Sequence, residues 1–157
     1  MSTPITTRGY EMLREELRQL KTVRRPEIVQ AIKEARDKGD LSENAEYDAA
    51  KELQGIVEAR IAELETKLAS FMVIEPSKLD AGDKVVFGAT VTLEEDETGE
   101  LVTYQVVGDD ESDITLNRVS VSSPIARAII GRHEGDEVTV HAPGGDRIYL
   151  IDTVEYV

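Results

Sequence analysis

Hydrophobic residues in the first part of the chain recur three and four positions apart, with charged residues between them. The first series comprises Leu13, Leu17, Leu20, Ile28, Ala31 or Ile32, and Ala35; the second comprises Ala50, Leu53, Val57, Ile61, Leu64, Leu68 and Phe71. This spacing places each series on one face of a helix. The last five members of the second series alternate steps of four and three, which is typical of a coiled-coil seam. The pattern therefore predicts two long amphipathic helices.

The segment between the two series is short, from Arg36 to Glu46, and it contains Gly39. A connection of this length makes the two helices antiparallel neighbours. The pattern changes phase near Arg24 and Pro26, and because proline removes a helical hydrogen bond we expect an irregularity there. With roughly 25 to 30 residues per helix at about 1.5 Å each, the hairpin would extend about 40 Å. A rod that serves only for dimerisation would show the same pattern.

After Pro76 the pattern changes from helical to alternating, in segments rich in Val, Thr, Ile and Tyr that are bounded by turn residues. The predicted strands are Val85 to Leu93, Leu101 to Val107, Arg118 to Ser122, Glu137 to Ala142 and Arg147 to Tyr156. One short helix is predicted between them, with Ser123 as its cap, Pro124 in its first turn and Gly131 at its end.

Together these patterns predict an α+β chain with two parts. An N-terminal antiparallel coiled-coil hairpin covers residues 1–75, a linker covers 76–83, and a small C-terminal antiparallel β domain with one short helix covers 84–157. The division suggests that the two parts have different partners, since residues 1–75 carry 12 basic and 15 acidic side chains and residues 76–157 carry 6 and 17.

The composition excludes several functional classes. The formal net charge of -14 argues against a protein that grips duplex DNA or RNA by itself, because such binding depends on Lys and Arg neutralising phosphates. The chain has no cysteine, so disulfides and thiolate metal sites are excluded. We find no apolar run long enough for a signal peptide or a membrane span, and we expect a cytoplasmic protein without membrane contact.

The connection between the helices carries the most promising chemistry. Four carboxylates, those of Asp37, Asp40, Glu43 and Glu46, fall within ten residues of each other. Asp40 and Glu43 are three positions apart, so on a turn or a first helical turn both can approach one cation. The same spacing also fits a capping box, with Asp40 as the N-cap and Glu43 at the third helical position. Local sequence alone favours the cap.

The C-terminal part contains a second acidic run, Asp109, Asp110, Glu111 and Asp113. It lacks the glycine and the terminal glutamate of a calcium-binding loop. We interpret it as a solvated loop.

The chain resembles the Gre family of bacterial transcript cleavage factors along essentially its whole length. In the hairpin the resemblance rests on Arg24-Arg25-Pro26-Glu27-Ile28, Glu34-Ala35-Arg36, Gly39-Asp40-Leu41-Ser42-Glu43-Asn44-Ala45-Glu46-Tyr47 and Ala49-Ala50-Lys51-Glu52. In the second part it rests on Val86-Phe87-Gly88-Ala89-Thr90-Val91, Val107-Gly108-Asp109-Asp110-Glu111, Ser123-Pro124-Ile125-Ala126-Arg127 and Pro143-Gly144-Gly145.

The resemblance implies a hairpin followed by a domain similar to the FK506-binding prolyl isomerases, without their activity. It also implies the partner: bacterial RNA polymerase that has backtracked, with the nascent RNA 3' end extruded into a side channel. The hairpin tip would reach the polymerase active site and promote cleavage of that RNA. The alternatives are a non-catalytic inhibitor that occupies the same channel and a coiled-coil adaptor without a catalytic role.

The resemblance assigns roles to individual residues. Asp40 would help to hold a Mg²⁺ ion shared with the polymerase, and Glu43 would ligate it or orient the attacking water. Two carboxylates alone hold Mg²⁺ weakly, so we expect neither metal binding nor nuclease activity from the isolated protein.

Two further pairs of residues receive contact roles from the resemblance. Arg36 and Lys51 would touch the extruded RNA, although solvated helix charges that pair weakly with Glu34, Glu52 or Asp48 would show the same pattern. Ser123 and Pro124 would dock on the polymerase, although as cap and first turn of a helix they also have a purely structural explanation.

Overall fold

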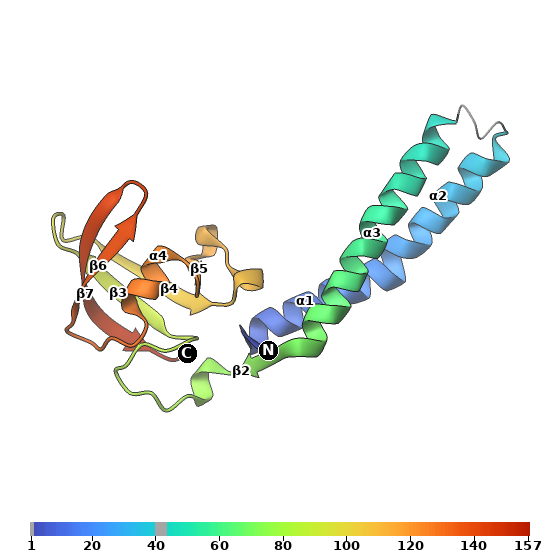
Figure 1. The fold of residues 1–157 in the computed structure, drawn as a ribbon. Helices are drawn as coiled ribbons and strands as arrows, with labels where there is room; N and C mark the ends of the chain where they lie inside the picture. The colour runs from blue at the N-terminus through green and yellow to red at the C-terminus, as the bar shows by residue number, and fades with distance from the viewer. Residues whose placement is uncertain (1, 40–43) are drawn as a thin grey trace. The chain divides into compact units, whose positions relative to one another are not determined.

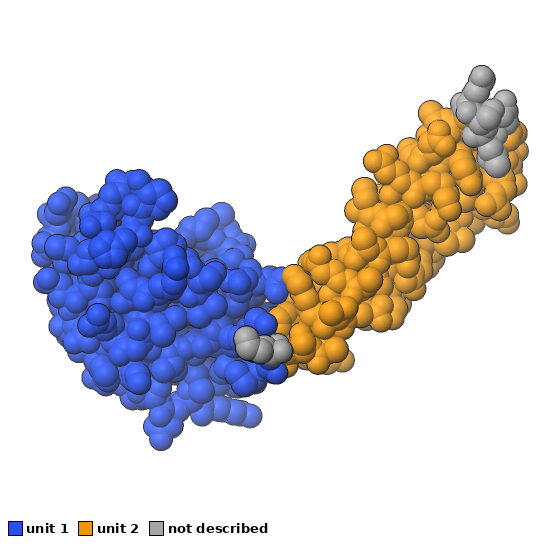
Figure 2. All heavy atoms as spheres, in the orientation of Figure 1, with its two compact units in different colours: residues 1–9, 72–157 blue, residues 10–71 orange. Residues whose placement is uncertain are grey.

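The computed structural model describes residues 2–39 and 44–157. The chain divides into two compact units, one formed by residues 10–71 and the other by residues 1–9 together with 72–157 (Figure 2). Residues 2–9 thus belong to the same unit as the C-terminal part, although the predicted hairpin includes them. Asp40 and Glu43, the two predicted catalytic residues, lie outside the described residues.

Helices dominate residues 10–71 (Figure 1). They are α1 (Thr7–Gln19), a π-helical segment (Leu20–Arg24), α2 (Arg25–Asp37) and α3 (Ala45–Ser70). Residues of both predicted apolar series are buried, including Leu13, Ile28, Ile32, Ala35, Ala50, Val57, Ile61 and Leu64. The predicted helical hairpin is therefore confirmed for these residues.

Ion pairs between α2 and α3 show that the two helices run antiparallel. Lys38 at the end of α2 pairs with Glu46 at 2.7 Å, and Arg25 at its start pairs with Glu58 at 2.8 Å. The paired residues are 8 positions apart in sequence near the connection and 33 positions apart farther from it, as expected for antiparallel helices. Because both pairs are exposed to solvent, each should contribute little to the stability of the hairpin.

The predicted irregularity near Pro26 is the π-helical segment. A proline at this position cannot donate the bond that a regular helix would send to the carbonyl of Thr22. The π-helical segment ends at Arg24, and Pro26 lies in the first turn of α2, which follows it. Within this segment, the hydroxyl of Thr22 donates to the Arg18 carbonyl at 2.8 Å.

The second unit contains a five-stranded sheet in the order β5-β4-β3-β7-β6 (Figure 1). Its strands are β3 (Thr90–Glu95), β4 (Leu101–Val107), β5 (Arg118–Ser120), β6 (Glu137–Ala142) and β7 (Gly145–Glu155). Every pairing is antiparallel except β4 with β5, which is parallel. The short helix α4 (Pro124–Ile129) packs on β6 and β5. A mostly antiparallel sheet with one short helix, as predicted, is confirmed.

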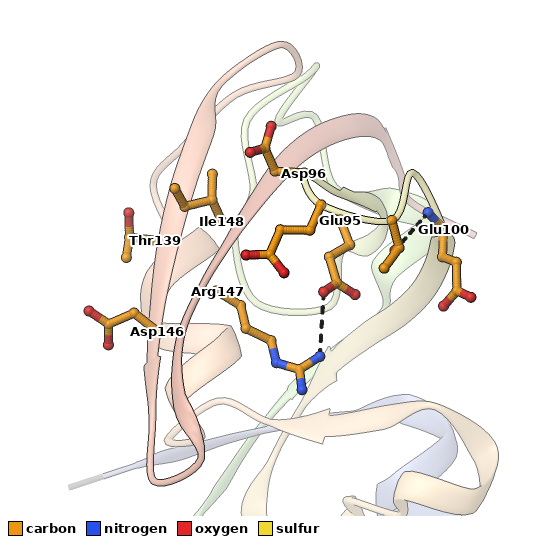
Figure 3. A pocket seen from close by; sticks show the side chains of 9 residues that line it. Glu95, Asp96, Glu100, Thr139, Asp146, Arg147 and Ile148 are labelled. Carbon is orange, nitrogen blue, oxygen red and sulfur yellow. Dashed lines mark hydrogen bonds and ion pairs between the residues drawn. The ribbon is translucent and has the colours of Figure 1, made fainter.

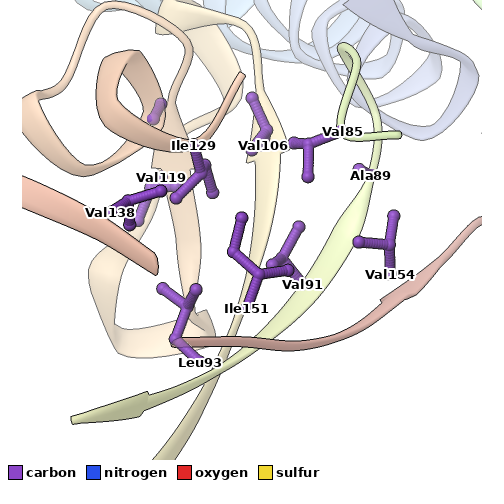
Figure 4. Packing of buried hydrophobic residues seen from close by; sticks show 11 residues of the cluster. Val85, Ala89, Val91, Leu93, Val106, Val119, Ile129, Val138, Ile151 and Val154 are labelled. Atoms are coloured by element: carbon purple, nitrogen blue, oxygen red, sulfur yellow. The ribbon is translucent and has the colours of Figure 1, made fainter. Parts of the chain in front are cut away.

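The core of this unit lies between the sheet and α4 (Figure 4). Leu93, Val106, Ile129 and Ile151 are fully buried in it. Val85 is equally buried, but it precedes β3 and lies in no strand, so the predicted start of the first strand was wrong. The reason is Gly88, whose φ of 92° turns the chain sharply between Val85 and the start of β3 at Thr90.

A short two-stranded sheet, β1 (Thr3–Thr6) with β2 (Phe71–Ile74), completes the strands of the described chain. Phe71 was predicted on the seam of the second helix, but that helix ends at Ser70 and Phe71 begins β2. Within the described residues, no helix is long and apolar enough to cross a membrane.

The carboxylate of Glu111 attaches the first residues of the chain to the C-terminal part of their unit. It accepts hydrogen bonds from the backbone N–H of Thr6 at 2.8 Å, the Thr6 hydroxyl, and the N–H of Gly108 at 3.0 Å. Arg8 donates to the same carboxylate at 3.2 Å. Glu111 is only 3% exposed, so the interpretation of this acidic run as a solvated loop was wrong for Glu111.

Two glycines leave space for this buried carboxylate. A Cβ atom on Gly9 would overlap the Glu111 side chain, and one on Gly108 would lie 2.8 Å from the carbonyl oxygen of Pro4. These contacts explain why the attachment requires glycine on both sides.

Candidate functional site

The described residues on either side of the predicted catalytic tip belong to the end of α2 and the start of α3. Asn44 is the N-cap of α3, and its side-chain oxygen accepts a hydrogen bond from the N–H of Tyr47 at 3.0 Å. Its amide nitrogen donates to the carbonyl of Ala35 in α2 at 2.6 Å. One side chain therefore satisfies an orphan donor of α3 and gives the Ala35 carbonyl a second donor besides the Lys38 N–H.

This geometry corrects the capping interpretation of the two predicted catalytic residues. Because α3 begins at Ala45, its cap is Asn44 and its third position is Tyr47, so Asp40 and Glu43 are not the capping pair of this helix. The cap was misplaced because Asp and Asn are almost equally good N-caps, and spacing alone cannot decide between them. Asn44 thus caps α3, and capping of this helix no longer explains why Asp40 and Glu43 occupy their positions.

Replacing Asn44 by Ala should destabilise the hairpin by about 1–2 kcal/mol, because both the cap and the bond to Ala35 are lost. Asn44→Asp keeps the acceptor for the Tyr47 N–H but loses the donor, so its loss should be smaller. Urea unfolding followed by far-UV circular dichroism measures both. Equal stability of the wild type and Asn44→Ala would contradict the role of this side chain.

The two predicted RNA-contact residues lie on facing helices and are exposed. Arg36 is in the last turn of α2 and forms no side-chain hydrogen bond or ion pair with any other described residue. Lys51, in α3, donates to the side chain of Gln54 at 3.0 Å. Neither side chain forms the weak pairs with described acidic neighbours that the alternative explanation proposed. Both charges remain accessible to an anionic partner.

The acidic residues described beside the tip are exposed, and one of them is paired. Glu46 is engaged by Lys38, and this hydrogen bond raises the pKa of Lys38 above its ordinary value. Asp37 and Asp48 are exposed. Over residues 2–39 and 44–157, no group of three or more His, Asp or Glu side chains is placed to hold a metal ion.

Ser123 and Pro124 have the structural roles that the sequence predicted. Ser123 is the N-cap of α4, where its hydroxyl accepts from the Ala126 N–H at 3.3 Å and donates to the Ser120 carbonyl at 2.7 Å. Pro124 occupies the first turn. It also lines a cavity of about 260 Å³ with Arg127 and His141, so part of its ring faces a recess at the surface.

A larger cavity, of about 620 Å³, lies between the β3–β4 connection and the β6–β7 hairpin (Figure 3). Its polar lining is mostly acidic: Glu95, Asp96, Glu97, Thr98, Glu100, Thr139, Asp146 and Arg147. Arg147 pairs with Glu95 at 3.5 Å. The surplus of negative charge makes this cavity unsuitable for nucleic acid.

Two family profiles match the chain. The profile described as "Transcription elongation factor, N-terminal" matches residues 3–73, and the profile "Transcription elongation factor, GreA/GreB, C-term" matches residues 80–156. Together they cover both the helical hairpin and the sheet.

Individual proteins are similar over their whole length. The chain is 60% identical to "Transcription elongation factor GreA" of Ralstonia nicotianae, covering 100% of each chain. It is 59% identical to the protein of the same name from Methylococcus capsulatus, covering 99% of this chain and 98% of that one. Among solved structures, GreA factor homolog 1 (Gfh1) of Thermus thermophilus is 27% identical over 99% of each chain, with a TM-score of 0.44.

Proposed function

The chain belongs to the GreA/GreB family of transcription elongation factors, and from this membership we propose that it binds backtracked RNA polymerase and stimulates cleavage of the extruded RNA. The tip of the hairpin would pass through the polymerase side channel to the active site. Cleavage would create a new RNA 3' end in register, so that elongation resumes.

The observation that best supports a chemical role for the tip is the position of Asn44. It caps α3 and ties α2 to it, so the tip does not need Asp40 or Glu43 to begin that helix. Their carboxylates are the type of ligand that Mg²⁺ prefers, and two are too few to hold the ion without further ligands from the polymerase. When bound there, Mg²⁺ would activate water and stabilise the leaving oxygen.

In this proposal Asp40 binds the shared metal ion, and Glu43 either binds it or orients the attacking water. Arg36 and Lys51 contact the phosphates of the extruded RNA, which their exposure and their positions on two neighbouring helices support. Ser123 and Pro124 contribute to docking on the polymerase. We also expect the sheet unit to share the fold of the FK506-binding prolyl isomerases without their activity.

The main alternative is an inhibitor that occupies the same channel without cleavage. Stalled, backtracked polymerase carrying 3'-labelled RNA distinguishes the two, with and without the protein. We expect short labelled 3' fragments and restored elongation. Slower synthesis without fragments would support the inhibitor instead.

Without polymerase, the protein should not cleave naked RNA in the presence of Mg²⁺. Its carboxylates are too few to hold the ion, and its formal net charge of -14 repels phosphate. Incubation of the purified protein with labelled RNA measures this directly. Robust cleavage would show that the protein is a nuclease in its own right and that the donor proposal is wrong.

A further inference from the structure

Two arginines face a small cavity inside the sheet unit, far in sequence from the hairpin tip. The cavity has a volume of about 190 Å³, and its lining includes Arg8, Gln105 and Arg118. Arg8 comes from the start of α1, Gln105 from β4 and Arg118 from β5, so the cavity exists only because the first residues are attached to the sheet.

The guanidinium groups of Arg8 and Arg118 are close enough to repel each other. Burial, and next to it the charge of Arg118, lowers the pKa of Arg8 from its ordinary value, while Glu111 acts in the opposite direction. Both arginines are half-buried, so water screens their repulsion only in part. An anion placed between them would relieve it.

The acidic groups around the two arginines leave most of their donors unused. Glu111 meets Arg8 through one contact at 3.2 Å, and its remaining capacity is taken by Thr6 and Gly108. Arg118 forms no side-chain hydrogen bond or ion pair within the part of the chain that the structure describes. A guanidinium has five N–H donors in a fork that suits phosphate, so unused donors of this kind are a strong element of an anion site.

The carboxylate of Glu75 opposes an anion, because it lines the same cavity. It accepts hydrogen bonds from the hydroxyls of Thr7 and Ser77, which lower its pKa and keep it charged. Asp113 also lies within electrostatic reach of Arg118, but its carboxylate is bonded to Thr115. The site should therefore bind its ligand weakly, and the charge of Glu75 provides a sensitive control.

We propose that this cavity binds a phosphate group between the guanidinium groups of Arg8 and Arg118. The group would be either free phosphate or the phosphate of a monoester whose organic part extends into solvent, since the cavity has no room for more. This site is separate from the proposed cleavage function and does not depend on it.

The test is an NMR titration of the full chain with inorganic phosphate at constant ionic strength, following the backbone amides. We expect saturable shifts at Arg8, Gln105 and Arg118, with a dissociation constant on the order of millimolar. Titrations with adenosine monophosphate and with adenosine distinguish the two sources. If adenosine monophosphate shifts the same amides as inorganic phosphate and adenosine does not, the site accepts a phosphate monoester. If only inorganic phosphate shifts them, the ligand is free phosphate.

Arg118→Gln is the decisive variant, because its side chain supports no other described residue through a hydrogen bond. It should weaken phosphate binding about tenfold or more, as expected for a lost charge-assisted contact. Arg132→Gln is the matched control, since it removes the same charge from an exposed position of the same unit, and it should leave the affinity within about twofold.

Glu75→Gln should strengthen binding, because it removes the opposing charge and retains one side-chain oxygen as an acceptor. Three results would overturn the proposal: no saturable shifts, unchanged affinity in Arg118→Gln, or an equal loss in Arg132→Gln. An equal loss in Arg132→Gln would show that phosphate binding depends only on the overall charge of the protein.

Discussion

Asp40→Asn and Glu43→Gln should each reduce RNA cleavage on backtracked polymerase by orders of magnitude while leaving the fold and the binding of polymerase nearly unchanged. Each replacement preserves the size of the side chain and removes a negative charge and a strong Mg²⁺ ligand. An interaction made mainly in the transition state affects the rate and not the binding. The measurement is single-turnover cleavage of 3'-labelled RNA, together with competition against the wild type for stalled polymerase.

Asn44→Ala provides the matched control for these variants. It weakens the same tip structurally, because Asn44 caps α3 and bonds to Ala35, but it leaves both carboxylates in place. It should lose stability and retain much of its cleavage activity at a temperature where the hairpin is folded. If Asp40→Asn and Glu43→Gln kept near-normal cleavage, the assignment of both residues would be wrong.

The helices of the hairpin could be predicted because their signal is local and repeated. Residues such as Ile28, Ile32, Val57 and Ile61 recur at helical spacing, and all of them are buried. Pro26 likewise predicted an irregular turn, because the absence of a backbone N–H in proline depends on no distant contact. The number of residues that repeat the same pattern makes the prediction robust to the substitution of any one of them.

The attachment of the first residues to the sheet could not be predicted, because it depends on one distant contact. Glu111 meets Thr6 across 105 positions of the sequence, and nothing near either residue indicates the pairing. In its own neighbourhood Glu111 is one acid among several, a composition typical of a solvated loop. The cavity between Arg8 and Arg118 was missed for the same reason, since it forms only after this attachment.

The candidate site shows an intermediate case. The sequence indicated that a polar residue near the tip caps the second helix, but Asp40 and Asn44 satisfy the same local rule. The choice depends on the carbonyl of Ala35, which only the antiparallel packing brings to Asn44. The resemblance to a family singled out Asp40 and Glu43, where composition and spacing left two explanations open.

Glu111→Ala should release the first residues of the chain from the sheet. The Thr6 and Gly108 N–H groups and the Arg8 guanidinium would lose their shared acceptor, and a buried donor without a partner costs free energy. We expect amide exchange at Thr6 and Gly108 to accelerate about a hundredfold or more, equivalent to about 3 kcal/mol of lost protection. Hydrogen exchange followed by NMR measures it residue by residue.

Glu111→Gln tests whether charge or shape holds the segment. Its amide fills the same volume and retains one oxygen acceptor, but it turns an NH₂ group toward donors. The loss of exchange protection at Thr6 and Gly108 should therefore persist in this variant. Glu100→Ala is the control, because Glu100 is an exposed acid of the same unit whose removal should change stability by no more than about 0.5 kcal/mol. Unchanged exchange at Thr6 and Gly108 in both Glu111 variants would mean that packing around Ile5 holds the segment and that the buried carboxylate contributes little.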